Sequence, residues 1–442
     1  MNKTKQSGIY MRLVIGNWIS CLFMLGIISS CSVSKQIARQ ANAILLNDTA
    51  IRTGHIGISI YEPATSRYWY NYNATKYFIP ASNTKLFTLY AGMKYLGDSL
   101  VGLRYQMKGD STVIEPAGDP TFLLSEFKNQ AVLNFLKNQK KIYLSENFLY
   151  KDFLGNGWAW NDFKDGYMAQ RSSFPIYGNV IKAKWVNADS INIYPSFYQK
   201  QSGVVEKVNT GFEVIKDFEN NHFIFINGND KNKEVPFRPT IVDIQSLLED
   251  TLKTKIGSDW WIHDKKGTLK IYSQPADLLF KPMMHRSDNF FAEQTLLMAG
   301  NEHLGYMSDE KIIDTLLNSY LKDVPQKPRW VDGSGLSRYN LFTPQSFVYI
   351  LNKTKNEFGW DRLKNILPTG GTGTLSSYFK KESGFIYAKT GTLSNNCALS
   401  GFLVTQKGKL LIFSVLANNY MTGATPVRKA VEKFLLDIRE KY

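Results

Sequence analysis

Three short motifs in this chain hold the residue types of a serine acylation site. In chain order they are Ser82-Asn83-Thr84-Lys85, Ser287-Asp288-Asn289 and Lys389-Thr390-Gly391. A serine hydroxyl becomes a useful nucleophile only when a base lies within hydrogen-bond reach. On a helix, residues three apart lie on the same face, one turn from each other. The first motif therefore predicts Ser82 as the nucleophile and Lys85 as its base.

The second motif contributes a hydroxyl and an amide. Ser287 offers a hydroxyl that relays a proton between Lys85 and a leaving amine. Asn289 offers an amide that holds substrate backbone. The same three residues also have a plain alternative interpretation as a cap for the helix that starts at Phe290.

The third motif follows a strand-like run. Lys389 is a cation that would lower the pKa of a neighbouring lysine and, together with Thr390, bind a substrate carboxylate. Gly391 is expected to leave room for an extended peptide. The backbone N–H groups of Ser82 and Thr392 are then the candidate oxyanion hole.

No single motif is specific. Ser-x-x-Lys recurs at Ser32, Ser125, Ser308, Ser319 and Ser377, whereas Lys-Thr-Gly occurs once. An isolated Ser-x-x-Lys reads more simply as a helix cap followed by a surface lysine. The order of the three motifs, and the elements around them, favour the catalytic interpretation.

Those elements are predicted from periodicity. Apolar spacing indicates a helix over Ser34 to Leu46, and Pro80 and Gly97 mark the start and end of another that carries the first motif. From about residue 105 to 267 the chain changes to short β-rich runs, with an Asn227-Gly228 turn signal, and helical patterns then return.

Strands at both ends of the chain are expected to join one antiparallel sheet. They are Ile56 to Tyr61, Tyr68 to Tyr72, Gly384 to Thr390, Ala398 to Thr405 and Leu410 to Ala417, before a last helix from Pro426 to Lys441.

Residues 1–30 have the features of an export signal. Lys3, Lys5 and Arg12 precede an apolar stretch from Leu13 to Ile28. The following Ser29-Ser30-Cys31 predicts lipidation of Cys31 and a bacterial lipoprotein attached to a membrane. A plain signal peptide that happens to contain a cysteine is the alternative.

The remaining composition excludes other classes. The net charge of +15 comes from scattered Lys and Arg, which predicts a solvated basic surface and no nucleic-acid partner. The five histidines show no metal-binding spacing, so we expect neither a metal nor a cofactor. Of the three cysteines only Cys397 lies beyond residue 31, and it is expected to be a buried apolar residue.

With these motifs, the chain resembles the class C low-molecular-mass penicillin-binding proteins, the peptidase S13 family of D-alanyl-D-alanine carboxypeptidases and endopeptidases. The motif set is the one known from penicillin-binding proteins and class A β-lactamases. Further matching segments are Ala117-Gly118-Asp119-Pro120-Thr121, Gly157-Trp158-Ala159-Trp160-Asn161-Asp162, Asp332-Gly333-Ser334-Gly335-Leu336-Ser337-Arg338 and Gly373-Thr374-Leu375.

The resemblance implies an α+β fold. A β-lactamase/transpeptidase-like domain of an antiparallel sheet flanked by helices (31–104 and 268–442) would be interrupted by a mainly β insertion (105–267). It implies a serine D,D-peptidase that acts on peptidoglycan stem peptides, is acylated by penicillins and other β-lactams at Ser82, and works at the periplasmic face of a bacterial membrane.

The resemblance also implies residue roles. Ser82 would be acylated with Lys85 as base and Ser287 as relay, and Lys389 would be the electrostatic partner. Substrate would be bound by Asn289, Lys389, Thr390, Gly391 and Thr392. A pocket for a diaminopimelate-type side chain, built partly from the insertion, would include Asp162, Phe163, Tyr167 and Arg338.

Two alternatives remain open from the residues. A β-lactamase or esterase shares the acylation step but needs fast deacylation. The class A enzymes have a dedicated Glu and a much shorter path between the first two motifs, and neither is found. A non-catalytic wall-binding lipoprotein would tolerate loss of Ser82 or Lys85, and both are present.

Overall fold

The computed structural model describes residues 33–145, 150, 152–187, 190–205, 212–226, 232–260 and 267–442. The predicted export signal, Cys31 and the Asn227-Gly228 turn lie outside these residues. Within the described part of the chain, no helix is long and apolar enough to cross a membrane.

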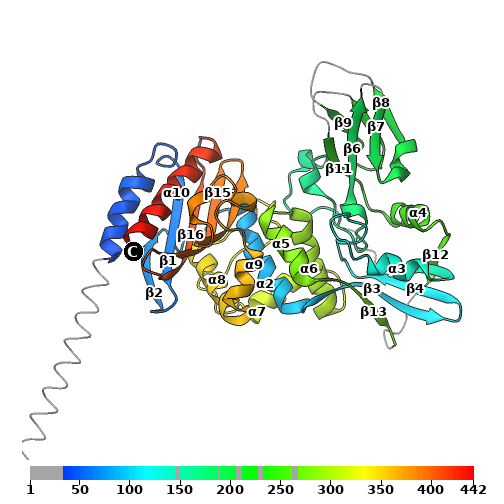
Figure 1. Cartoon of the computed structure of the whole chain (residues 1–442), viewed down its shortest axis with the longest axis horizontal. Coiled ribbons are helices and arrows are strands. Elements are labelled where there is room, and N and C mark those ends of the chain that lie inside the picture. Colours follow the sequence, from blue (N-terminus) through cyan, green and yellow to red (C-terminus); the bar gives the residue numbers. More distant parts are fainter. Residues whose placement is uncertain are drawn as a thin grey trace, which may run out of the picture.

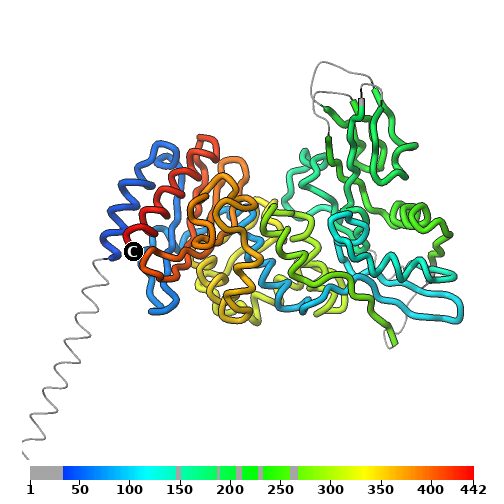
Figure 2. The backbone as a smooth tube through the Cα atoms, viewed as in Figure 1, coloured from blue at the N-terminus to red at the C-terminus, as the bar shows by residue number. Residues whose placement is uncertain are grey.

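A five-stranded antiparallel sheet joins the two ends of the chain. Its order is β14-β15-β16-β1-β2, so the last strands pair with the first, as the sequence predicted. Figure 2 shows the blue and red ends of the tube side by side at one end of the molecule. The strands are β1 (His55–Glu62), β2 (Arg67–Tyr72), β14 (Ile386–Leu393), β15 (Asn396–Val404) and β16 (Leu410–Asn418).

Helices cover both faces of this sheet (Figure 1). A helix over 33–40, its π-helical continuation (Ala41–Leu46) and α10 pack on one face around a core that includes Ile58, Phe413 and Phe434. The other face packs on a larger core around Phe87 and Phe280. The helices are α2 (Lys85–Tyr95), α5 (Ala276–His285), α6 (Asn289–Leu304), α7 (Asp309–Asn318), α8 (Pro344–Phe358), α9 (Trp360–Ile366) and α10 (Ala424–Lys441).

Local capping fixes the helix that follows the second motif. The Asp288 side chain accepts a hydrogen bond from Phe291 N, and Gly305 ends α6 in the left-handed conformation. The capping interpretation of Ser287-Asp288-Asn289 is therefore correct. It is compatible with a catalytic role, because a cap fixes the side chains next to it.

The chain between α2 and α5 forms a separate β-rich region with its own core, which includes Leu103, Tyr198 and Phe237. Its largest sheet has the order β12-β5-β4-β3-β13. The strands are β3 (Ser99–Lys108), β4 (Ser111–Pro116), β5 (Lys141–Ser145), β12 (Ile256–Trp260) and β13 (Leu269–Pro275). The expected boundary at 104/105 falls inside β3, and β13 lies just beyond the boundary at 267/268 although it pairs with β3.

Two three-stranded sheets complete this region, in the orders β11-β6-β7 and β8-β10-β9. They contain β6 (Val180–Asn187), β7 (Ser190–Tyr194), β8 (Ser202–Val205), β9 (Glu213–Lys216), β10 (Phe223–Ile226) and β11 (Asn232–Pro236). Two helices, α3 (Ala131–Lys137) and α4 (Ile241–Leu252), were not expected in it. The signal for α4 was present in the sequence, because Thr240 caps it and Ile244, Leu247 and Leu248 share its buried face.

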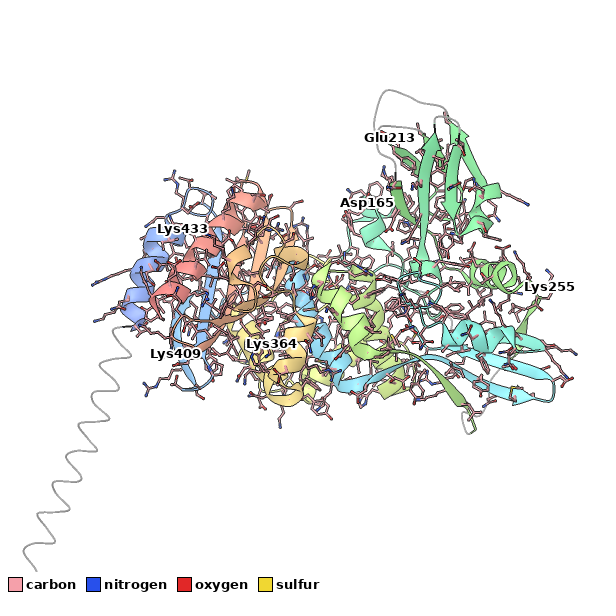
Figure 3. The ribbon with its side chains drawn as sticks, viewed as in Figure 1. Asp165, Glu213, Lys255, Lys364, Lys409 and Lys433 are labelled. Atoms are coloured by element: carbon pink, nitrogen blue, oxygen red, sulfur yellow. The ribbon has the colours of Figure 1, made fainter. Side chains whose placement is uncertain are left out.

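In Figure 3 the labelled Lys364, Lys409 and Lys433 lie on the part of the molecule that holds the five-stranded sheet and its helices, and Lys255 lies at the opposite end. The solvated basic surface stays a prediction.

Candidate active site

The first motif places its serine and lysine side by side. Ser82 lies in the 3₁₀ turn η2 (Ala81–Thr84), and Lys85 is the first residue of α2. Lys85 Nζ donates a hydrogen bond of 2.9 Å to Ser82 Oγ. The Lys85 side chain is fully buried, whereas Ser82 is partly exposed and lines a cleft. This is the geometry of a nucleophile and its base.

Two further oxygens hold the Lys85 amine. Asn289 Oδ1 and the Ser334 carbonyl oxygen each accept a hydrogen bond of 2.7 Å from Nζ. Burial lowers the pKa of Lys85 to about 8, against the opposing charges of Asp332, Glu293 and Asp288. Some neutral amine is therefore present near neutral pH.

Lys389 also has a lowered pKa. Burial comes first among the causes that hold the pKa of Lys389 well below its usual range, followed by the charges of Lys85 and Arg428. Burial is likewise the first cause of the lowered Lys85 pKa.

Ser287 contacts this second lysine. Lys389 Nζ donates hydrogen bonds of 2.8 Å to Ser287 Oγ and 2.7 Å to the Thr390 carbonyl oxygen. Ser287 has a φ of 62°, which is uncommon for a residue with a side chain and occurs at functional sites. The second and third motifs therefore meet at the hydrogen bond between the Lys389 amine and the Ser287 hydroxyl.

A tight loop, residues 332–340, supports the Ser334 carbonyl. Asp332 is buried and accepts hydrogen bonds from the backbone N–H groups of Gly335 (2.8 Å) and Ser337 (2.7 Å). Ser334 N–H donates a 2.7 Å hydrogen bond to Glu293 Oε1 on α6. Ser334 thus connects the buried Glu293 carboxylate to Lys85: its N–H bonds to Glu293 and its carbonyl oxygen bonds to Lys85.

The inserted region supplies the partner of this carboxylate. Arg171 is 2% exposed and reaches Glu293 Oε2 at 3.4 Å and Asp309 on α7. It also donates to the carbonyl oxygens of Asp152 and Leu154. Burial, then the charge of Asp332, raises the pKa of Glu293 to about 7, and Arg171 opposes that rise. Sequence analysis identified neither Glu293 nor Arg171.

The structure gives a steric reason for the glycine at position 391, beside the predicted one. A Cβ at this position would lie 2.6 Å from the Pro80 carbonyl oxygen and 3.1 Å from Ser82 N. Glycine is therefore needed because β14 packs directly against η2, and a side chain at position 391 would collide with the backbone of that turn. This close approach brings the edge strand β14 beside the Ser82 N–H. The N–H groups of Ser82 and Thr392 therefore remain the candidate oxyanion hole.

A cleft of about 730 Å³ opens at Ser82. Most of the predicted site residues line this cleft, and they come from η2, the inserted region, α6, the 332–340 loop and β14. Those that line it are Ser82, Asp162, Tyr167, Ser287, Asn289, Arg338 and Thr392. Lys85 and Lys389 are buried behind Ser82 and Ser287, to which they are hydrogen-bonded.

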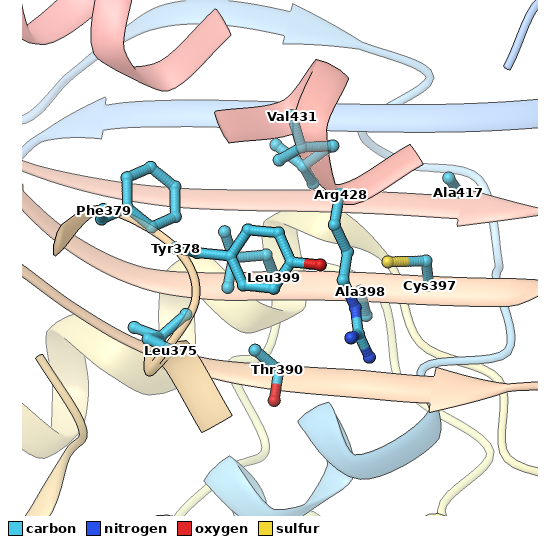
Figure 4. Close-up of a pocket in the computed structure, with 11 residues that line it drawn as sticks. Leu375, Tyr378, Phe379, Thr390, Cys397, Ala398, Leu399, Ala417, Arg428 and Val431 are labelled. Atoms are coloured by element: carbon cyan, nitrogen blue, oxygen red, sulfur yellow. The ribbon is translucent and has the colours of Figure 1, made fainter. Parts of the chain in front are cut away.

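Two predicted residues lie elsewhere. Phe163 packs on Phe218, with ring centroids 5.2 Å apart, and Lys216 Nζ lies 5.3 Å from the centroid of its ring. Thr390 lines a small apolar pocket between β14 and α10, which Figure 4 shows. Residues alternate between the faces of a strand, so Thr390 points away from the face of Lys389.

Arg428 is a site residue that the sequence analysis missed. In Figure 4 its side chain extends from α10 toward β14, past Cys397. It donates a hydrogen bond to Thr392 Oγ1, and its charge lowers the pKa of Lys389. Among the described residues it is in no ion pair. No local sequence signal marks it, because only the packing of α10 on the sheet brings it near β14.

A serine and a lysine at the start of a helix, beside the edge strand of an antiparallel sheet and a second serine–lysine pair, define an acyl-serine enzyme of the transpeptidase-like fold. Comparison with family models agrees with this class, since the model of the D-Ala-D-Ala carboxypeptidase 3 (S13) family matches residues 38–438. The chain therefore belongs to this family of serine-type carboxypeptidases.

Individual relatives are distant but span most of the chain. Penicillin-sensitive carboxypeptidase A of Dictyostelium discoideum is 22% identical in an alignment that covers 85% of this chain and 85% of that protein. The crystal structure of penicillin binding protein 4 (dacB) from Haemophilus influenzae matches with a TM-score of 0.73 at 21% identity, covering 91% of this chain and 99% of that one. The structure of that protein complexed with a novel β-lactam has a TM-score of 0.68 at 17% identity, covering 92% and 99%. These two structures share the fold.

Proposed function

We propose that this protein is a serine D,D-peptidase that cleaves peptidoglycan stem peptides through an acyl-enzyme on Ser82. The observation that carries the proposal is the 2.9 Å hydrogen bond between Ser82 Oγ and the buried Lys85 amine at the cleft. Membership of the S13 family supports the substrate class.

In acylation, neutral Lys85 takes the proton of Ser82 as Oγ bonds to the carbonyl carbon of the penultimate D-Ala. The C–N bond then breaks as Ser287 gives its hydroxyl proton to the leaving amine and takes from Lys85 the proton that came from Ser82, which leaves Lys85 neutral again. The N–H groups of Ser82 and Thr392 stabilise the oxyanion, and each such donor typically contributes about 10²–10³ in kcat. Water then hydrolyses the ester.

Substrate recognition follows from the cations around β14. Lys389, hydrogen-bonded to Ser287 Oγ, and Arg428, hydrogen-bonded to Thr392 Oγ1, are proposed to attract the carboxylate next to the leaving amine. A terminal D-Ala-D-Ala and a D-Ala cross-link both present this D-configured acyl group. Penicillins present a similar one, and the β-lactam complex of the structural relative supports this partner.

The stem-peptide side chain is proposed to bind between Asp162 and Arg338. Both line the cleft, and Arg338 donates to the Ser394 carbonyl oxygen at 3.3 Å. A carboxylate and a guanidinium suit the amino and carboxylate ends of a diaminopimelate-type side chain. Replacing Asp162 by Ala without loss of activity on such a substrate would remove this assignment.

We further propose that the mature chain begins at a lipid-modified Cys31 and works at the periplasmic face of a bacterial membrane. The basic residues, the apolar stretch and the small residues before Cys31 support this proposal. Mass spectrometry of the protein from its native membrane tests it. An unmodified Cys31, or a mature protein that starts elsewhere, would contradict it.

Labelling with a fluorescent penicillin tests the acyl-enzyme. The wild type should retain the label, and Ser82→Ala should take up none. Ser377→Ala is the matched control, because Ser377 begins another Ser-x-x-Lys in the same chain and should label normally. Rapid turnover of the label by the wild type would indicate a β-lactamase, and no adduct would indicate a binding protein.

A further inference from the structure

Exposed aromatic side chains lie at the mouth of the catalytic cleft. Trp160 is 75% exposed and begins the 3₁₀ turn η4 (Trp160–Asp162), whose last residue lines the cleft. Tyr167 and Tyr339 are each 50% exposed and line the cleft themselves. Large rings that gather in water on a protein surface mark binding sites. Neither Trp160 nor Tyr339 has a part in the catalytic steps proposed above.

Two contacts hold the segment before Trp160 against the catalytic domain. A Cβ at Gly157 would lie 2.6 Å from Tyr339 Cδ2, so the backbone of the inserted region packs directly on that ring. One residue further on, Trp158 Nε1 donates a 3.0 Å hydrogen bond to Oδ2 of the buried Asp332. Trp160 follows after two residues. It is therefore held at the same rim of the cleft as Tyr339, each from a different region of the chain.

The chemistry of this rim suits a carbohydrate. The indole of Trp160 is a flat apolar surface, and the neighbouring Asn161 is exposed and has an amide that can donate and accept hydrogen bonds. A sugar ring has the matching features, because its C–H groups form an apolar face and its hydroxyl and acetamido groups form hydrogen bonds at its edge. Neither side chain is charged, which fits a neutral ligand.

The proposed substrate brings a sugar to this position. Stem peptides are attached to the amino sugars of a glycan strand. With the acyl group on Ser82 and the diaminopimelate-type residue between Asp162 and Arg338, two residues of the stem remain before the sugar. Two extended residues span about 7 Å. The protein chain from Asp162 back to Trp160 is also two residues long, so the sugar falls within reach of the indole.

We propose that Trp160, with Asn161 and Tyr339, forms a subsite for the N-acetylated disaccharide of the glycan strand. The subsite rests on the proposed function, because the stem peptide at Ser82 is what brings the sugar to the rim. It adds a preference for stem peptides that still carry sugar over free peptides. The enzyme is thereby directed to the intact wall rather than to peptide fragments.

A comparison of two substrates tests the subsite with the wild type alone. Release of D-Ala is measured from a pentapeptide that carries the disaccharide and from the same pentapeptide without it. We expect kcat/KM to be about fivefold higher on the first, the size of one aromatic stacking contact, with the difference in KM. Equal values on the two substrates would overturn the subsite.

Trp160→Ala should abolish this preference. Because the side chain is so exposed, folding, penicillin labelling and kcat/KM on the free pentapeptide should not change. On the disaccharide-pentapeptide, kcat/KM should fall about fivefold to the value of the free peptide. Trp160→Phe keeps an aromatic face and should retain most of the preference. Tyr306→Ala is the matched control, since Tyr306 is 51% exposed just beyond the end of α6 and should affect neither substrate.

Two outcomes with Trp160→Ala contradict the subsite. Equal losses on both substrates would show that Trp160 acts on the peptide, and a preference that survives the substitution would show that the indole does not bind the sugar. A wild type that takes no penicillin label and releases D-Ala from neither substrate contradicts the proposed function itself. The two failures are therefore distinct.

Discussion

Lys85 suits the proposed role of a base because it is buried among oxygen acceptors rather than exposed to water. Three acceptors fix its amine, and burial lowers its pKa although three carboxylates raise it. The balance between desolvation and these charges decides how much neutral amine is present at a given pH.

The rate of penicillin acylation should therefore depend on pH. Ser82 needs a neutral Lys85, and the pKa of that amine is about 8. The second-order labelling rate should rise about tenfold per pH unit below 8 and level off above it. Stopped-flow labelling from pH 5.5 to 9.5 measures this, with the melting temperature recorded at each pH. A flat or falling rate between pH 6 and 8 would exclude Lys85 as the base.

Glu293→Gln should shift that profile to lower pH. The amide keeps an oxygen acceptor for Ser334 N–H but removes a negative charge that raises the pKa of Lys85. The effect should be clearest above pH 7, where the wild-type carboxyl is ionised. Glu302→Gln, on the same helix and paired with Arg104, is the control and should leave the midpoint in place. An unshifted midpoint in Glu293→Gln would contradict the effect of the Glu293 charge on the pKa of Lys85.

At the scale of elements, the site depends on how closely three segments approach one another. The turn η2, the 332–340 loop and the edge strand β14 meet around Ser82, and glycines permit two of the contacts. A Cβ at Gly335 would lie 2.0 Å from the Ala81 carbonyl oxygen, and one at Gly391 would lie 2.6 Å from that of Pro80. Both would collide with backbone, which cannot move aside as a flexible side chain can.

Gly391→Ala should accordingly damage both stability and acylation. Overpacking of this kind typically costs about 1–3 kcal/mol, and the displaced strand would carry Thr392 N–H away from Ser82. We expect a lower melting temperature and a large loss of penicillin labelling. Gly203→Ala in β8, where the nearest atom would be 3.5 Å away, is the control and should melt and label like the wild type. Normal labelling of Gly391→Ala would show that the close approach is not needed.

At the scale of the whole molecule, the inserted region completes the catalytic domain rather than merely extending from it. Trp158 Nε1 donates to Asp332 Oδ2 at 3.0 Å, and Arg171 pairs with Glu293. Both contacts reach the network that holds the Ser334 carbonyl against Lys85. A substitution that disturbs this junction is therefore expected to lower the activity of the whole protein.

Arg171→Met should destabilise the protein strongly. The substitution leaves buried Glu293 without its cation, and breaking a buried pair typically costs about 3–5 kcal/mol. Urea unfolding monitored by tryptophan fluorescence measures the loss. Lys140→Met breaks a well-exposed pair with Asp110 and should change stability little. Equal stability of the two variants would contradict the junction described above.

The sequence by itself determined the local parts of this protein. Ser82 and Lys85 are three residues apart on a helical turn, so their contact follows from helix geometry, and the strands at both chain ends were apparent from their apolar runs. Motif order was enough to indicate the family to which the chain belongs.

Only the tertiary structure decided the rest. The contacts of Lys85 with Ser334, of Glu293 with Arg171 and of Arg428 with Thr392 join residues far apart in the chain. No periodicity encodes such pairs, because they arise from the packing of whole elements. For the same reason the sequence could not show how closely β14 approaches η2 at Gly391 or how deeply Lys85 is buried, since close approach and burial exist only in the folded chain.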